Sequence, residues 1–194
     1  MGRPAAPASS CSANTLPSAA DVVAFWREAG PDKWWAKDEP FDEEIRRRFL
    51  PLHKSAAEGE LSHFEETSEG ALALLILLDQ FPRNLFRNSP RAFATDQKAR
   101  EVAERALARG LDRHFDDELG SFFYMPFMHS ERLADQERCV VLFQALGIQD
   151  NIRAATEHRD IIACFGRFPH RNEVLGRETS QEERRFLDEG GFKG

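Results

Sequence analysis

The sequence predicts an all-α protein, and three observations support this. Apolar residues recur every three or four positions, which is the spacing that gathers them on one face of a helix. Typical start and stop signals bracket these stretches, with Ser before them and Gly after them. No segment alternates apolar and polar residues between tight turns, as paired strands do. We therefore expect about eight helices joined by short loops.

The first four expected helices span residues 18–30, 42–59, 68–81 and 95–109. Ser18 and Asp21 resemble a capping box, and the acidic residues 42–44 favour a helix start electrostatically. Pro51 lies inside the second helix and is expected to kink it. The third helix is the most apolar, so we expect it at the centre of the core. The fourth has one apolar face, which indicates packing on that core.

The other four expected helices span residues 121–129, 133–146, 151–165 and 180–190. The first of these contains Pro126 and is expected to be short and broken. Gly147 and Gly166 are placed to end the next two helices. Ser180 and Glu183 form a second capping box, which starts the last helix.

Length and composition indicate a single globular domain. The chain has 194 residues, of which 41% are apolar, enough to bury a substantial core. Residues 1–17 are rich in Ala, Pro and Ser without periodicity, so we predict a disordered tail before one helical domain over residues 18–194. The longest apolar run, residues 71–78, is far shorter than the roughly 20 residues of a membrane helix, so no membrane association is expected.

The charge and the scattered metal-binding residue types exclude several classes of function. A net charge of −7 repels phosphate backbones, so no nucleic-acid partner is expected. The basic run 46–48 follows Glu43 and Glu44 at helix-pairing distance, which indicates a solvated helix face. The six histidines follow no metal-binding spacing and no glycine-rich phosphate loop occurs, so we predict no metal and no cofactor.

The cysteines indicate a reducing compartment. Three are present, at Cys11, Cys139 and Cys164, without the spacing of a disulfide framework or a metal site. Free thiols in a cytoplasmic protein explain this pattern best.

One phrase occurs twice in the chain. Phe81-Pro82-Arg83-Asn84 and Phe168-Pro169-His170-Arg171-Asn172 each follow an apolar stretch. Because proline lacks an N–H and clashes with the preceding turn, each phrase is expected to break a helix and present Arg and Asn just beyond the break. We therefore predict two matched helix corners that face one site, with Arg83 and Arg171 close together.

Three motifs together resemble a known family. They are Asp79-Gln80-Phe81-Pro82-Arg83-Asn84, Tyr124-Met125-Pro126-Phe127-Met128-His129-Ser130-Glu131, and Phe165-Gly166-Arg167-Phe168-Pro169-His170-Arg171-Asn172. Over roughly residues 20–194 the chain resembles the bacterial family called domain of unknown function 924. The resemblance implies antiparallel helical hairpins in a tetratricopeptide-like superhelical domain, and it implies no activity. The chain shows no tetratricopeptide consensus, so the superhelix rests on the resemblance alone.

The candidate ligand-binding residues lie in or near these motifs. They are Asp79, Arg83, Asn84, Arg87, Tyr124, Arg167, His170, Arg171 and Asn172. Guanidinium groups bind carboxylates and phosphates in pairs of hydrogen bonds, and the amides add donors and acceptors. The alternative is that each arginine only fixes a corner, for instance by pairing with a carboxylate such as Asp79. Both interpretations stay open.

His158 and His129 are the candidate catalytic residues. His158 lies on the apolar side of its helix, where it is either a general base or a core histidine held by one hydrogen bond. His129 is a candidate pocket group beside Ser130, which we interpret as the N-cap of the next helix and not as a nucleophile.

These residues lead to competing hypotheses for function. The first is a polar pocket that binds a small anionic ligand, with proton transfer by a histidine if any chemistry occurs. The second is a helical scaffold whose groove binds a peptide or a protein partner. A third is that the polar residues only hold the fold. We favour the pocket slightly, because four arginines cluster near the repeated phrase of an otherwise acidic chain. The ligand, the reaction, the oligomeric state and whether the protein is an enzyme are left open.

Overall fold

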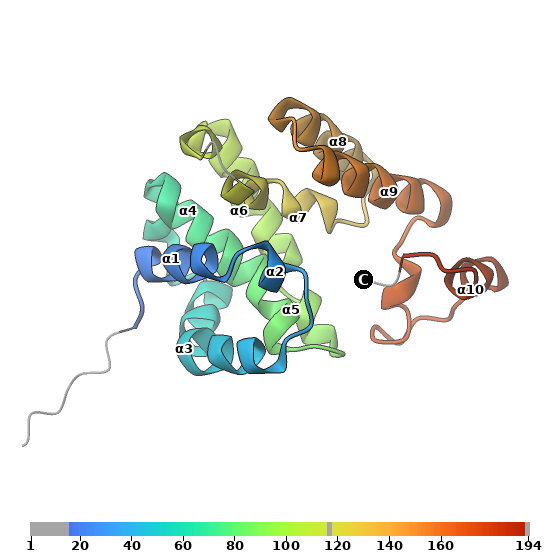
Figure 1. The fold of residues 1–194 in the computed structure, drawn as a ribbon, viewed down its shortest axis with the longest axis horizontal. Helices are drawn as coiled ribbons and strands as arrows, with labels where there is room; N and C mark the ends of the chain where they lie inside the picture. The colour runs from blue at the N-terminus through green and yellow to red at the C-terminus, as the bar shows by residue number, and fades with distance from the viewer. Residues whose placement is uncertain (1–15, 116–117, 193–194) are drawn as a thin grey trace, which may run out of the picture.

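The computed structural model in Figure 1 describes residues 16–115 and 118–192, and all of their regular structure is helical. The all-α prediction is therefore confirmed. The α-helices are α1 (Ala19–Ala29), α2 (Pro31–Trp34), α3 (Glu39–Glu58), α4 (Ser68–Leu75), α5 (Phe81–Leu85), α6 (Asp96–Ala108), α7 (Met125–Met128), α8 (Leu133–Leu146), α9 (Gln149–Phe165) and α10 (Gln181–Asp188). Short 3₁₀ turns join many of them. The tetratricopeptide-like superhelix and the single domain over residues 18–194 stay predictions.

Both expected capping boxes and two of the expected glycine helix ends are present. Ser18 and Asp21 form a complete capping box at α1, and Ser180 and Glu183 form one at α10. Gly147 and Gly166 end α8 and α9 in the left-handed conformation, with φ of 81° and 69°. Because only glycine adopts that conformation without a steric penalty, these two positions fix the helix ends. Residues 1–15 of the expected tail lie outside the described residues.

The predicted break at Pro82 is wrong. α4 passes directly into a π-helical turn, η2 (Ile76–Gln80), and then into α5, which has Pro82 in its first turn. In the π turn the Phe81 N–H donates to Ile76 O, five residues back. A proline at the start of a helical segment needs no N–H partner, so the widened turn lets the chain continue through it. α3 likewise continues across Pro51.

Side chains donate to the carbonyls around the π turn. His53 Nδ1 donates to Leu77 O at 2.9 Å, and Thr95 Oγ1 donates to Leu78 O at 2.5 Å. Arg83 donates to Asp79 O. Since buried carbonyls are costly to leave unpaired, these side chains stabilise the irregular turn.

The second proline also follows a helix end instead of causing it. α9 ends at Phe165, and Pro169 starts the 3₁₀ turn η6 (Pro169–Arg171). The two copies of the repeated phrase therefore have different backbones, and the predicted matched corners are not present.

The apolar residues form one large core and one small one. The large core runs through α1 and α3–α8, with a contribution from α9 at Ala155, and buries Trp26 and many of the phenylalanines. The small core centres on Ile161, Ile162 and Phe168, at the C-terminal end of α9. In Figure 1 the segment that carries η6 and α10 lies to one side of α1–α6. Within the described ranges, no helix is both long and apolar enough to cross a membrane.

The two described cysteines differ in exposure, which gives a labelling prediction. Cys139 and Cys164 are both free, but Cys139 is buried and Cys164 is exposed. Burial raises the pKa of the Cys139 thiol, which keeps it unreactive. In a Cys11→Ser variant we expect a maleimide to modify Cys164 within minutes and Cys139 only after denaturation. Mass spectrometry of the native protein checks this, and rapid labelling of Cys139 or a Cys139–Cys164 disulfide would contradict it.

Candidate functional site

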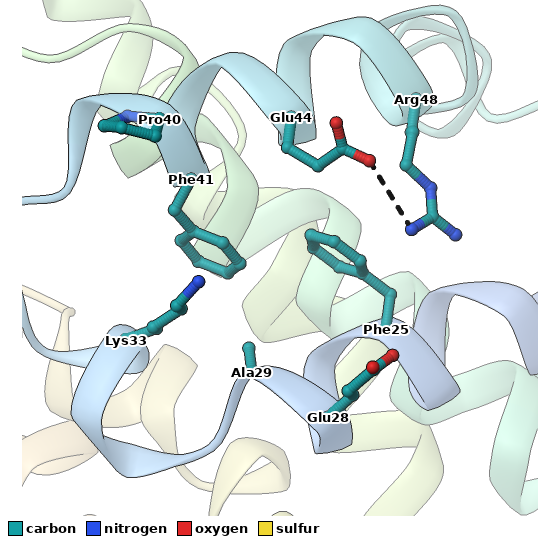
Figure 2. Close-up of a pocket in the computed structure, with 8 residues that line it drawn as sticks. All are labelled: Phe25, Glu28, Ala29, Lys33, Pro40, Phe41, Glu44 and Arg48. Atoms are coloured by element: carbon teal, nitrogen blue, oxygen red, sulfur yellow. Dashed lines mark ion pairs between the residues drawn. The ribbon is translucent and has the colours of Figure 1, made fainter.

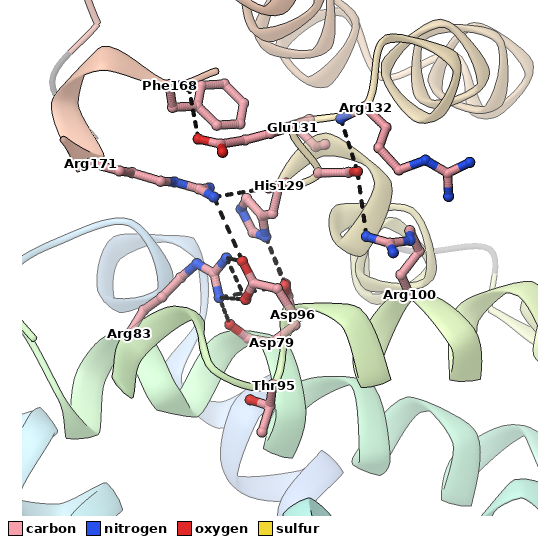
Figure 3. A network of polar contacts seen from close by, with 12 residues as sticks. Asp79, Arg83, Thr95, Asp96, Arg100, His129, Glu131, Arg132, Phe168 and Arg171 are labelled. Carbon is pink, nitrogen blue, oxygen red and sulfur yellow. Dashed lines mark hydrogen bonds and ion pairs between the residues drawn. The ribbon is translucent and has the colours of Figure 1, made fainter. Parts of the chain in front are cut away.

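Asp79 is the centre of a buried polar cluster. It lies in the π turn and is only 1% exposed. Its two carboxylate oxygens lie 2.8 and 2.9 Å from His129 Nδ1, and Gln80 also donates to it. Figure 3 shows Asp79 beneath His129, with Arg83 beside both. π-helical turns occur often at functional sites, because they change the direction of one side chain within a helix.

His129 caps the C-terminal end of α7 and is anchored through one ring nitrogen only. Because Asp79 is an ionised acceptor, Nδ1 carries the hydrogen and Nε2 carries the lone pair. No described residue forms a hydrogen bond with Nε2, and Nε2 is not among the fully buried unpaired atoms. The free nitrogen of this carboxylate–imidazole pair therefore belongs to a side chain that is 14% exposed.

Arg83 links the first repeated phrase to the start of α6. Its guanidinium donates two hydrogen bonds of 3.2 Å to Asp96, the first residue of α6. It also lies 3.4 Å from an Asp79 oxygen. Arg83 therefore joins the two carboxylates of the cluster.

Arg171 enters the cluster from η6. Its Nη1 donates to His129 O at 3.1 Å and lies 3.7 Å from Asp96 Oδ2. The rings of Phe93 and Phe168 lie 4.7 and 4.5 Å from the guanidinium carbon. Arg83 and Arg171 consequently meet at one carboxylate, as the repeated phrase led us to expect (Figure 3).

The electrostatics set the protonation states. Burial alone raises the pKa of Asp79, but Arg83 and His129 outweigh burial and lower it to about 2. Burial and the Arg83 charge lower the pKa of His129 below its ordinary value, against the opposing pull of Asp79. At neutral pH Asp79 is therefore ionised, and His129 is neutral and able to accept a proton.

A second group of contacts holds the C-terminal segment next to this cluster. Glu131 accepts hydrogen bonds from Arg177 at 2.7 and 3.0 Å, and from the Phe168 N–H at 2.9 Å.

The sequence predicted Ser130 as the N-cap of α8, and this prediction is wrong, because the cap residue is Arg132. The Ser130 hydroxyl instead accepts from the Arg132 N–H and donates to Asp135 at 2.6 Å.

Several of the predicted ligand-binding residues have partners elsewhere. Asn84 and Arg87 both bind Asp42 of α3. Arg167 binds Glu183 at the start of α10. Within the described part of the chain no hydrogen bond or ion pair joins these three residues to Asp79, Asp96 or His129. Of the four arginines, only Arg83 and Arg171 converge.

Tyr124 also lies outside the cluster. Its hydroxyl donates to Asp112 at 2.9 Å, and burial together with this bond raises the pKa of Tyr124 to about 12.

Of the other two predicted histidines, His158 is buried and His170 is half-buried. His158 Nδ1 donates to Ala154 O at 2.8 Å, and its ring packs against Phe168 and Phe192. This is the geometry of a core histidine held by one hydrogen bond. His170 Nδ1 is buried without a partner, and burial followed by the Arg171 charge lowers the pKa of His170 to about 3. The side-chain amide oxygen of Asn172, Oδ1, is also buried and unpaired.

Sequence reasoning missed Asp96, the carboxylate that both arginines share. Its position in the sequence bears no regular spacing to Arg83 or Arg171. An acidic residue in the first turn of a helix such as α6 is common and does not by itself indicate a site. The only available signal was chemical, since a buried arginine requires a carboxylate, a carbonyl or a bound anion. Among residues 16–115 and 118–192, no three acidic, cysteine or histidine side chains gather where they could hold a metal ion.

Two cavities lie away from the Asp79 cluster. A cavity of about 400 Å³ between α1 and α3 appears in Figure 2, lined by Phe25, Glu28, Ala29, Lys33, Pro40, Phe41, Glu44 and Arg48. A groove of about 570 Å³ runs between α9 and α10, with Ile161, Phe165 and Phe186 among its apolar walls. Neither includes a residue of the cluster.

A family comparison covers nearly all of this structure. The family model described as bacterial protein of unknown function (DUF924) matches residues 22–191. The chain belongs to the DUF924 family. This DUF924 protein is also similar to a solved structure of a protein of unknown function from Agrobacterium tumefaciens, at 50% identity and a TM-score of 0.86. That match covers 89% of this chain and 97% of the other. A comparison with curated proteins found no match.

Proposed function

We propose that the Asp79 cluster binds a small anionic molecule and that His129 is its proton acceptor. The observation that carries the proposal is the one-sided anchoring of His129: the Asp79 carboxylate holds Nδ1, and Nε2 has no described hydrogen-bond partner in a side chain that is 14% exposed. A carboxylate that fixes the tautomer and orientation of an imidazole is the usual arrangement of a general base. His158, which has the geometry of a core histidine, is held by a backbone carbonyl and not by a carboxylate.

The competing structural explanation accounts for part of the cluster. Asp79 and Asp96 balance the charges of Arg83 and Arg171, so the four side chains hold η2, α6 and η6 together without any ligand. Charge balance does not require the contact between the Asp79 carboxylate and the neutral His129 ring. It also leaves the Arg171 Nε–H buried without an acceptor.

Acylation by diethyl pyrocarbonate tests the proposal, because the reagent attacks neutral, accessible imidazoles. We expect it to modify His129 at pH 7, and His158, which is buried, to stay unmodified. At least one of inorganic phosphate, acetate and succinate should slow the reaction at His129 but not at the exposed His63, which is the internal control. Peptide mapping by mass spectrometry measures each site. An unreactive His129, or a rate that no anion in this panel changes, would overturn the proposal.

The scaffold alternative has one specific observation in its favour. The open groove between α9 and α10 has mostly apolar walls, of the kind that accepts an apolar helix face. If no anion protects His129 and Phe186→Ala abolishes binding of a partner peptide, the scaffold becomes the better proposal.

A further inference from the structure

The guanidinium of Arg171 has one edge in use and one edge free. Nη1 donates to His129 O and faces Asp96, whereas no described residue accepts a hydrogen bond from Nε or Nη2. The hydrogens of Nε and Nη2 point in the same direction, so together they form the side-on edge that binds a carboxylate with two parallel hydrogen bonds. Arg87, Arg105 and Arg167 all use this edge for a carboxylate in this protein.

The free edge lies in a costly environment. Only 8% of the Arg171 side chain is exposed, and Nε is fully buried. Burial and the nearby Arg83 charge lower the pKa of Arg171 to about 10. An unpaired buried N–H of a charged group is destabilising, so a partner at this edge would recover free energy that the protein alone does not.

We infer that the free edge of Arg171 recognises the carboxylate group of a small monocarboxylic acid, held beside His129. This inference rests on the proposed function and specifies its ligand. The rings of Phe93 and Phe168 lie against the guanidinium, so a ligand head at this edge would meet apolar surface as well as the two donors. A carboxylate matches the planar pair of donors and brings fewer oxygens against the apolar rings than a tetrahedral phosphate does.

The charge of the cluster also favours a monoanion. The two carboxylates already balance the two guanidinium groups. One further negative charge can be balanced by a proton on His129, whereas a dianion leaves one charge uncompensated in a buried setting. Because Nε is buried, binding also requires the protein atoms that cover it to move. Arg171 lies in η6, a turn of only three residues, so a shift of this short segment would expose the edge.

Titration of the full-length protein with acetate and with inorganic phosphate, at equal ionic strength, tests the inference. The signals to follow by NMR are the Arg171 Nε–H and the His129 ring. We expect acetate to shift both signals and to bind at least tenfold more tightly than phosphate. In Arg171→Lys, which keeps the charge but lacks the planar edge, acetate binding should weaken at least tenfold. Arg177→Lys is the control, and acetate binding should not change. Arg177 Nε is also buried without an acceptor, but Nη2, which completes its side-on edge, already binds Glu131.

The outcomes separate this inference from the function it rests on. If phosphate shifts the His129 ring signals and acetate does not, the inference of a monocarboxylate ligand is overturned, but the proposed anion site stands. If acetate binds to Arg171→Lys as well as to the wild type, the inference that the Arg171 edge recognises the carboxylate is overturned. If neither anion shifts His129, both proposals fail. The wild-type Arg171 Nε–H shift decides the point even if Arg171→Lys folds poorly, which circular dichroism will show.

Discussion

A Gly70→Ala variant is expected to unfold about 3 kcal/mol more easily than the wild type, at the upper end of the cost of overpacking. A Cβ added at Gly70 would lie 2.0 Å from Phe64 O and 2.8 Å from Phe64 C. These are backbone atoms of the 3₁₀ turn η1 (Ser62–Glu66), which cannot rotate away as a side chain can. The turn or the start of α4 must therefore shift, against the intrinsic preference of about 1 kcal/mol for alanine in a helix.

Urea denaturation followed by circular dichroism measures the effect. Glu69→Ala is the matched control, because Glu69 is exposed in the same helical turn and its loss should cost less than about 1 kcal/mol. Equal stabilities of Gly70→Ala and the wild type would mean that η1 and α4 do not pack as closely as described.

Helix starts and ends were predictable because their signals are local. A capping box joins residues three positions apart, and a glycine end depends on one backbone conformation. The role of Gly70 was not predictable in this way. Gly70 must lack a side chain because the backbone of the neighbouring turn η1 lies against it. No pattern of residues in the sequence predicts this close approach.

The wrong prediction at Pro82 has a physical explanation. The rule that proline ends a helix assumes that every carbonyl in the preceding turn needs a backbone N–H. Here His53 and Thr95 donate to the carbonyls of Leu77 and Leu78, and both donors lie far from those carbonyls along the chain. Tertiary hydrogen bonds therefore replaced the local ones that the sequence rule counts.

The candidate site was predictable in part. The three motifs contained Asp79, Arg83, His129 and Arg171, which do come together. The grouping of Arg87 and Arg167 with them did not follow, because the carboxylates that bind those two arginines come from α3 and α10. The motifs identified the charged residues correctly. Which carboxylate each arginine binds depends on the fold, because the partners come from distant parts of the sequence.

Asp79→Ala is expected to lower the free energy of unfolding by about 3–5 kcal/mol, the usual cost of removing one partner of a buried charge network. The change leaves the His129 Nδ1–H without its acceptor and removes one of the carboxylates beside Arg83. Chemical denaturation at pH 7 measures the loss. Asp79→Asn is the matched control, since an amide oxygen can still accept from His129 and the shape is conserved, so a smaller loss is expected.

Acid unfolding distinguishes the charge of Asp79 from its shape. The pKa of Asp79 in the folded protein is about 2, below the value of 3.8 for a free side chain. Its ionised form therefore contributes stability above pH 4, and this contribution is lost as the pH falls toward 2, by roughly 2 kcal/mol at 1.36 kcal/mol per pKa unit. Asp79→Asn should lack that portion of the acid transition. Parallel stability curves of the wild type and Asp79→Asn between pH 4 and 2 would show that folding does not lower the pKa of Asp79. A wild type whose stability instead rises relative to Asp79→Asn as the pH falls from 7 to 4 would show that Asp79 is protonated in the fold. His129 would then lose the anionic acceptor on which its role as a base depends.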